Sequence, residues 1–177
     1  MKNTVSLRKL AAWFPAAGLM ALIFYFSAMP GEQSGALSSP WAARIVRAVV
    51  DVLAGVSGQD ALRDLASDGQ VLQAAEVVIR KSAHMAEYAL LGAALCFGFW
   101  INGYRKTVCH TFHLPAQFAA FLYAATDELH QLYVPGRTGK WSDVLVDSAG
   151  ACIGICIFLC LYHRKVFRTD PENLEKI

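Results

Sequence analysis

Residues 127–147 read DELHQLYVPGRTGKWSDVLVD, and this stretch decides the fold. Apolar runs flank it on both sides, one from Leu114 to about Val134 and one from about Ser142 to Tyr162. Each run is long enough to cross a bilayer, which takes about 20 residues in a helix. Since only the short turn Pro135–Lys140 lies between them, the two helices are predicted to form a hairpin with acidic residues beside its turn.

Two further apolar runs, Leu10–Met29 and about Ser82 to Ile101, complete the pattern. The whole chain of 177 residues is 55% apolar and 17% charged, whereas soluble domains average roughly 45–50% and about 25%. We therefore expect an all-α integral membrane bundle of four transmembrane helices, with a domain over 1–163 and a basic cytoplasmic tail over 164–177. The first run could instead be a cleaved signal peptide, but its apolar stretch exceeds the roughly 7–15 residues of such peptides.

The distribution of Lys and Arg predicts the orientation of the bundle. These residues are dense at both termini and in the Asn102–His113 loop, which places both termini in the cytoplasm. The long segment Pro30–Lys81 then faces outward. Within it, apolar residues recur at helical spacing over Pro40–Ala54, and Ser39 before Pro40 is a good helix start. This pattern predicts an amphipathic helix that lies on the outer interface or covers the bundle.

Ionisable residues within the spans are costly, by roughly 2.5–3.5 kcal/mol each, so they usually face the bundle interior and mark function. Here they cluster near the outer ends of three spans, which should bring them to one level of the membrane. The second span carries Lys81, His84 and Tyr88, the third carries Asp127, Glu128, His130 and Gln131, the turn carries Arg137, and the fourth carries Asp143 and Asp147.

The chemistry of these residues suggests two kinds of site. The candidate acid and base residues are Asp127, Glu128, His130, Asp143 and Asp147, which could also hold a divalent cation. The candidate ligand-binding residues are Lys81, His84, Tyr88, Gln131 and Arg137. No spacing is specific for a metal or a nucleophile, so cofactor and metal stay open. A third alternative is structural, with Asp127 or Glu128 paired to Arg137 and Asp143 paired to Lys140.

Small residues on the fourth span predict a close helix contact. Gly150 and Gly154 form a G-x-x-x-G pattern, which lets two helix backbones approach closely.

Several short motifs, in order along the chain, resemble the VanZ-like family. RKSAHMAEYALLG at 80–92 is similar to its K-x-x-H-x-x-x-Y-x-x-L-G element. DELHQ at 127–131, PGR at 135–137 and SDVLVD at 142–147 followed by Gly150 are similar to its D-E-x-x-Q…P-G-R…D-x-x-x-[DN]…G element. Phe26-Ser27, Pro30-Gly31 and Ser34 also match. The resemblance implies a bacterial inner-membrane protein, and the founding member is associated with resistance to the glycopeptide teicoplanin.

Two functions follow as expectations. The first is a membrane protein that binds an anionic lipid or a cell-envelope precursor headgroup at its outer face, with a link to glycopeptide resistance or envelope homeostasis. The second is an envelope hydrolase or transferase that acts on such a headgroup. The expected partner is the lipid bilayer, and the net charge of only +2 gives no basic field for nucleic acid.

Overall fold

The computed structural model describes residues 7–57, 60–102 and 112–169, and every element in them is helical. In chain order they are α1 (Leu7–Ala11), α2 (Phe14–Ser27), α3 (Gly31–Ser57), the 3₁₀ helix η1 (Asp60–Ser67), α4 (Gly69–Ile101), α5 (His113–Gln131) and α6 (Trp141–Thr169). The all-α prediction is confirmed. The basic residues Lys2, Arg105, Lys106 and Lys176, which contributed to the predicted orientation, lie outside the described residues, as does the end of the basic tail.

Three helical segments are long and apolar enough to cross a membrane: Leu7–Ser27, Gly69–Ile101 and Trp141–Tyr162. They correspond to the first, second and fourth predicted spans. The third predicted span is present as helix α5, but it is not among the three, and its last turns carry Asp127 and Glu128. The described part of the chain therefore has three helices of spanning character where four were expected.

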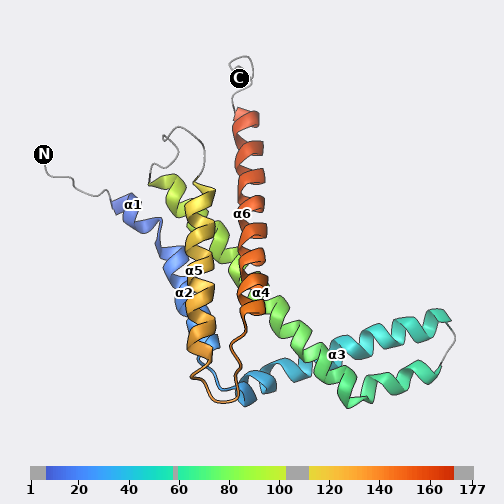
Figure 1. Cartoon of the computed structure of the whole chain (residues 1–177). Coiled ribbons are helices and arrows are strands. Elements are labelled where there is room, and N and C mark those ends of the chain that lie inside the picture. Colours follow the sequence, from blue (N-terminus) through green and yellow to red (C-terminus); the bar gives the residue numbers. More distant parts are fainter. Residues whose placement is uncertain (1–6, 58–59, 103–111, 170–177) are drawn as a thin grey trace, which may run out of the picture.

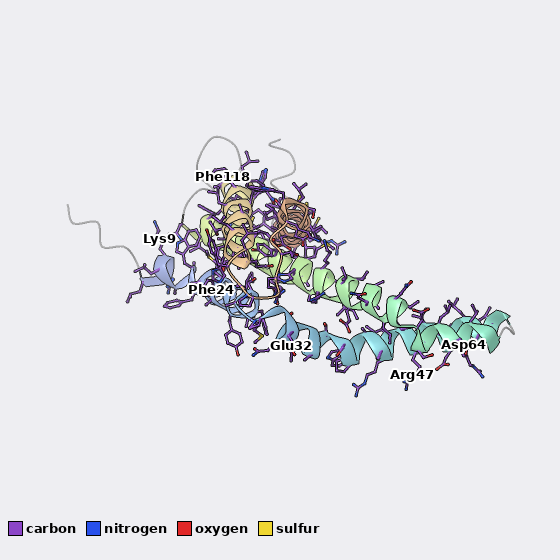
Figure 2. All side chains as sticks on the ribbon, turned by 60° about the horizontal axis from the view of Figure 1, so that its bottom comes forward. Lys9, Phe24, Glu32, Arg47, Asp64 and Phe118 are labelled. Carbon is purple, nitrogen blue, oxygen red and sulfur yellow. The ribbon has the colours of Figure 1, made fainter. Side chains whose placement is uncertain are left out.

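Helices α2, α4, α5 and α6 form a bundle in which α4 crosses diagonally beside the others (Figure 1). The beginning of α1 and the end of α6 lie at the same end of this bundle (Figure 1). At the opposite end, α3 and η1 leave the bundle as an arm that folds back to α4. Figure 2 shows Arg47 and Asp64 on this arm, well away from Phe24 and Phe118 in the bundle.

Glycines bring α4 and α6 into close contact, as the G-x-x-x-G pattern predicts. A Cβ on Gly154 would lie 1.7 Å from the carbonyl oxygen of Ala89, and one on Gly150 would lie 2.4 Å from that of Met85. Neither distance is possible for a real side chain, so only glycine permits this packing. The contact fixes the middle of α6, around Gly150 and Gly154, against the middle of α4.

The turn before α3 is docked onto the loop between α5 and α6. The Gly31 backbone N–H donates a hydrogen bond of 3.0 Å to the carbonyl oxygen of Pro135. Gly136 has a φ of 71°, a conformation that favours glycine, and a Cβ on Gly31 would lie 2.0 Å from its carbonyl oxygen. This contact holds the 135–140 loop across the end of the bundle.

Helix α3 starts earlier than the sequence predicts, because it begins at Gly31 and contains Pro40 in its interior. Proline removes one backbone donor, and the Ser38 hydroxyl bonds to carbonyl oxygens of the preceding turn, those of Ser34 and Gly35. The buried residues of the helix are Ser38, Ala42, Val46, Val50 and Ala54, whereas the predicted apolar face of Trp41, Ile45, Val49, Val52 and Leu53 is exposed.

Candidate functional site

A cavity of about 190 Å³ lies where the 135–140 loop closes the end of the bundle. Helices α4, α5 and α6 and the loop all contribute polar side chains to its wall, as the placement of polar residues in the sequence predicts. The charged and polar lining residues are Arg80, Lys81 and His84 from α4, Glu128 and Gln131 from α5, Arg137, Thr138 and Lys140 from the loop, and Asp143 and Asp147 from α6.

Asp127 lies behind this wall, in a buried hydrogen-bond network. Its Oδ2 accepts a 2.7 Å hydrogen bond from the Ser27 hydroxyl and a 3.2 Å bond from Gln131 Nε2. Gln131 Nε2 also approaches the Ser27 hydroxyl at 3.3 Å. All three residues are buried, so Asp127 connects α2 with α5 and reaches the cavity only through Gln131.

Two acids of the cavity wall have partners on neighbouring elements. Glu128 Oε2 accepts a hydrogen bond of 2.8 Å from the backbone N–H of Lys140, which fixes the start of α6 against α5. Asp143 forms an ion pair with Lys81 of α4. The pairs of the structural alternative are therefore wrong. Asp143 pairs with Lys81 of α4 rather than with Lys140, and Glu128 bonds the backbone of the loop rather than Arg137.

Arg137 and Arg80 are the two guanidinium groups of the cavity. Arg137 donates from Nε to the carbonyl oxygen of Met29 and from Nη2 to that of Phe26, both at 3.1 Å, and so caps the C-terminal end of α2. Among the described residues, neither arginine has a carboxylate within ion-pair distance. Burial lowers the pKa of the Arg137 guanidinium, and the nearby charge of Arg80 lowers it further. This corner of the cavity therefore holds two guanidiniums without an ion pair among the described residues, while Asp127 and Glu128 act on Arg137 through longer-range attraction.

Besides Asp127, two predicted site residues lie apart from the cavity wall. The His130 ring stacks on Phe24 with the centroids 4.8 Å apart, on the side of α5 that faces α2. Tyr88 is fully buried, with its ring 6.2 Å from that of Tyr123. Its hydroxyl has no hydrogen-bond partner within the described ranges. His84 does line the cavity, and its Nδ1 lies 3.8 Å from Glu87 Oε2.

The model of the VanZ/LLP1 family matches residues 12–162, which include every helix that lines the cavity. The chain belongs to the VanZ/LLP1 family. No curated protein and no solved structure matches the chain.

Membership of the VanZ/LLP1 family confirms the resemblance that the motifs carry, and the family is linked to glycopeptide resistance. The motif residues of this VanZ protein have two different places in the fold. Lys81, His84, Arg137, Asp143 and Asp147 line the cavity, whereas Ser27 and Asp127 form the network that connects α2 with α5.

Sequence reasoning gave Ser27, Arg80 and Lys140 too little weight. Ser27 is a hydroxyl at the end of an otherwise apolar run, which is a weak signal that only the partner at Asp127 makes meaningful. Arg80 and Lys140 look like ordinary anchors at the ends of spans, yet both line the cavity. In the part of the chain that the structure describes, no group of three or more His, Cys, Asp or Glu side chains is arranged to hold a metal ion.

Proposed function

We propose that this VanZ-family protein binds a phosphate-bearing headgroup, of a lipid or of a cell-envelope precursor, in the cavity between α4, α5 and α6. One observation carries the proposal: Arg80 and Arg137 line the same cavity, and neither has a carboxylate partner among the described residues. The guanidinium of Arg80 presents a planar fork of donors that matches phosphate oxygens. Arg137, whose Nε and Nη2 already bond backbone carbonyl oxygens, adds a second positive charge that attracts an anion.

The size of the cavity supports a headgroup rather than a larger molecule. About 190 Å³ is below the roughly 300–1,000 Å³ of typical small-molecule sites. Lys140 adds a further cation to the wall, and Gln131 and Thr138 add neutral polar groups. Such a wall can hold one phosphate with its attached polar atoms while the rest of the ligand stays outside.

The proposal includes a topology in which the cavity opens at the outer face of the inner membrane. Helix α5 serves as the fourth span, because it runs within the bundle beside α2 and α6 (Figure 1). Both described ends of the chain lie opposite the cavity, so cytoplasmic termini put the cavity outside. The exposed apolar face of α3, with Trp41, Ile45 and Val49, then lies on the outer interface of the bilayer.

An enzymatic role on the same headgroup is the second candidate, and the placement of His84 favours it. His84 lines the cavity together with Glu128 and Asp147, which gives an imidazole and two carboxylates facing one bound group. The Nδ1 atom of His84 is buried and has no hydrogen-bond partner within the described ranges. An imidazole with a nitrogen available can move a proton during hydrolysis or transfer of the headgroup.

Binding of inorganic pyrophosphate and of phosphatidic acid to the full chain in non-ionic detergent tests the proposal. Calorimetry should detect the first ligand and native mass spectrometry the second, and Arg80→Gln should weaken both by at least about tenfold, as expected for a charge-assisted hydrogen bond. Arg47→Gln is the matched control, since Arg47 is exposed on the arm, away from the bundle (Figure 2), and does not line the cavity. If wild-type protein binds neither anion, or if both variants behave alike, headgroup binding at this cavity is wrong.

A further inference from the structure

A second cavity, of about 250 Å³, adjoins the polar one at the point where the arm leaves the bundle. Its wall comes from the end of α2, the first turns of α3 and the middle of α4. The two cavities share Arg80, His84 and Arg137. Apart from these shared residues, most of the wall is apolar, and only Ser34, Ser38 and Glu87 are polar. The apolar lining residues are Phe26, Met29, Leu37, Trp41, Ile79 and Ala83.

The two cavities have different walls, and the difference indicates what kind of ligand could fill both. One side of Arg80 and Arg137 faces polar and charged groups, and the other side faces hydrocarbon and aromatic side chains. Leu37 is 58% exposed and Trp41 is 59% exposed, so their apolar surfaces are not covered by the described residues. A ligand that satisfies both cavities must carry an anion next to a flexible apolar chain.

We propose that the second cavity holds a hydrocarbon chain of the same molecule whose phosphate lies between Arg80 and Arg137, so that the ligand is a single anionic lipid bound across both cavities. This inference rests on the proposed headgroup site and names the class of its ligand. It favours a lipid-borne group over a free phosphate compound.

The position of the second cavity agrees with a lipid ligand. Ile79 and Ala83 of α4 line it next to the shared Arg80 and His84. A chain seated there would have its charged end at Arg137 of the 135–140 loop and its apolar part between the end of α2 and the first turns of α3. A volume of about 250 Å³ suits a narrow chain, whereas the roughly 10–12 Å diameter of a helix would not enter it.

The test compares two ligands with the same glycerol phosphate headgroup, glycerol 3-phosphate and a lysophosphatidic acid with a twelve-carbon chain. Both are titrated into the full-length protein in non-ionic detergent. Wild type should bind the lysophosphatidic acid at least about tenfold more tightly, because each buried CH₂ contributes to burial of apolar surface. Leu37→Asn, which adds a polar group but no charge beside the guanidiniums, should reduce this difference and leave the affinity for glycerol 3-phosphate unchanged.

Matched controls separate the cavity from general effects on the arm. Leu53→Asn introduces the same change on the same helix at a residue that is 53% exposed and outside the cavity, so it should bind both ligands as wild type does. A second variant, Ala83→Phe, fills the cavity, and Ala86→Phe is its control on the exposed side of α4. Ala83→Phe should weaken the binding of lysophosphatidic acid and leave the binding of the ligand without a chain unchanged.

The outcomes distinguish this inference from the function on which it rests. If Leu37→Asn and Ala83→Phe bind lysophosphatidic acid as tightly as wild type, the chain lies elsewhere and the inference is overturned, while the headgroup site stands. If wild type binds glycerol 3-phosphate and lysophosphatidic acid equally, the apolar cavity holds no chain. If wild type binds neither, the headgroup site fails and the inference fails with it.

Discussion

Ser27, the last residue of α2, donates a 2.7 Å hydrogen bond to the carboxylate of Asp127, one hundred positions later in α5. Both side chains are buried. An ionisable group inside a bundle is costly unless it has partners, and here the partners come from Ser27 and from Gln131 of the same helix. The network therefore fixes α5 against α2 and holds Gln131 in the cavity wall.

Removing the Ser27 hydroxyl should destabilise the bundle. We expect Ser27→Ala to lower the free energy of unfolding by about 1 kcal/mol, because the buried carboxylate of Asp127 loses a donor. Unfolding in mixed micelles, followed by circular dichroism, measures the change. Ser82→Ala, at an exposed position of α4, is the control and should unfold as wild type. Equal stability of the two variants would show that the Ser27–Asp127 bond contributes nothing.

Arg137 should be sensitive to a change that keeps its charge. Lysine cannot reach the carbonyl oxygens of Met29 and Phe26 with two separate donors as the guanidinium does. We expect Arg137→Lys to lower stability by about 1 kcal/mol and to weaken pyrophosphate binding. Arg80→Lys should weaken pyrophosphate binding without loss of stability, since Arg80 makes no hydrogen bond to the bundle within the described residues. A stable Arg137→Lys protein would contradict the capping role.

The contact between α4 and α6 should not tolerate a side chain on Gly154. A methyl group there would meet the Ala89 carbonyl oxygen, so the helices must separate, at a cost of about 1–3 kcal/mol for overpacking. Gly18→Ala is the matched control, because nothing lies within 4 Å of a Cβ on Gly18. We expect Gly154→Ala to lower the thermal midpoint in detergent and Gly18→Ala to leave it unchanged or raise it. The reverse order would contradict the close packing.

The ion pair between Lys81 and Asp143 gives a prediction about anion binding. Their side chains are 42% and 25% exposed, so the pair itself contributes less than about 1 kcal/mol to stability. If the cavity binds an anion, Asp143→Asn releases the Lys81 charge and should strengthen pyrophosphate binding by up to about fivefold. Weaker binding in the Asp143→Asn protein would mean that Asp143 helps to build the site.

Helical spacing made the polar cluster predictable from sequence. Lys81 and His84 share a face of α4, and Asp143 and Asp147 share a face of α6. The short turn before Trp141 places the end of α5 and the start of α6 at one level. These relationships are local, so they survive in any arrangement of the bundle. The close packing at Gly150 and Gly154 was predictable for the same reason.

Other features depend on how distant segments pack, and the sequence does not specify this. Asp127 and His130 are three residues apart on α5, yet the first bonds Ser27 and the second stacks on Phe24. The count of spanning helices differs because α5 places Asp127 and Glu128 within its own last turns. On α3, Pro40 indicated a helix start, whereas docking of Gly31 onto Pro135 starts the helix earlier.

Cysteine labelling in spheroplasts tests most directly the claim that α4 and the 135–140 loop enclose one anion site at the outer face. In a protein without native cysteines, Val77→Cys and Thr138→Cys place thiols in the cavity wall on these two elements. We expect both to react with an impermeant maleimide and both to be slowed by millimolar pyrophosphate. Labelling of the two positions from opposite sides of the membrane, or labelling that pyrophosphate leaves unchanged at both, would contradict the account.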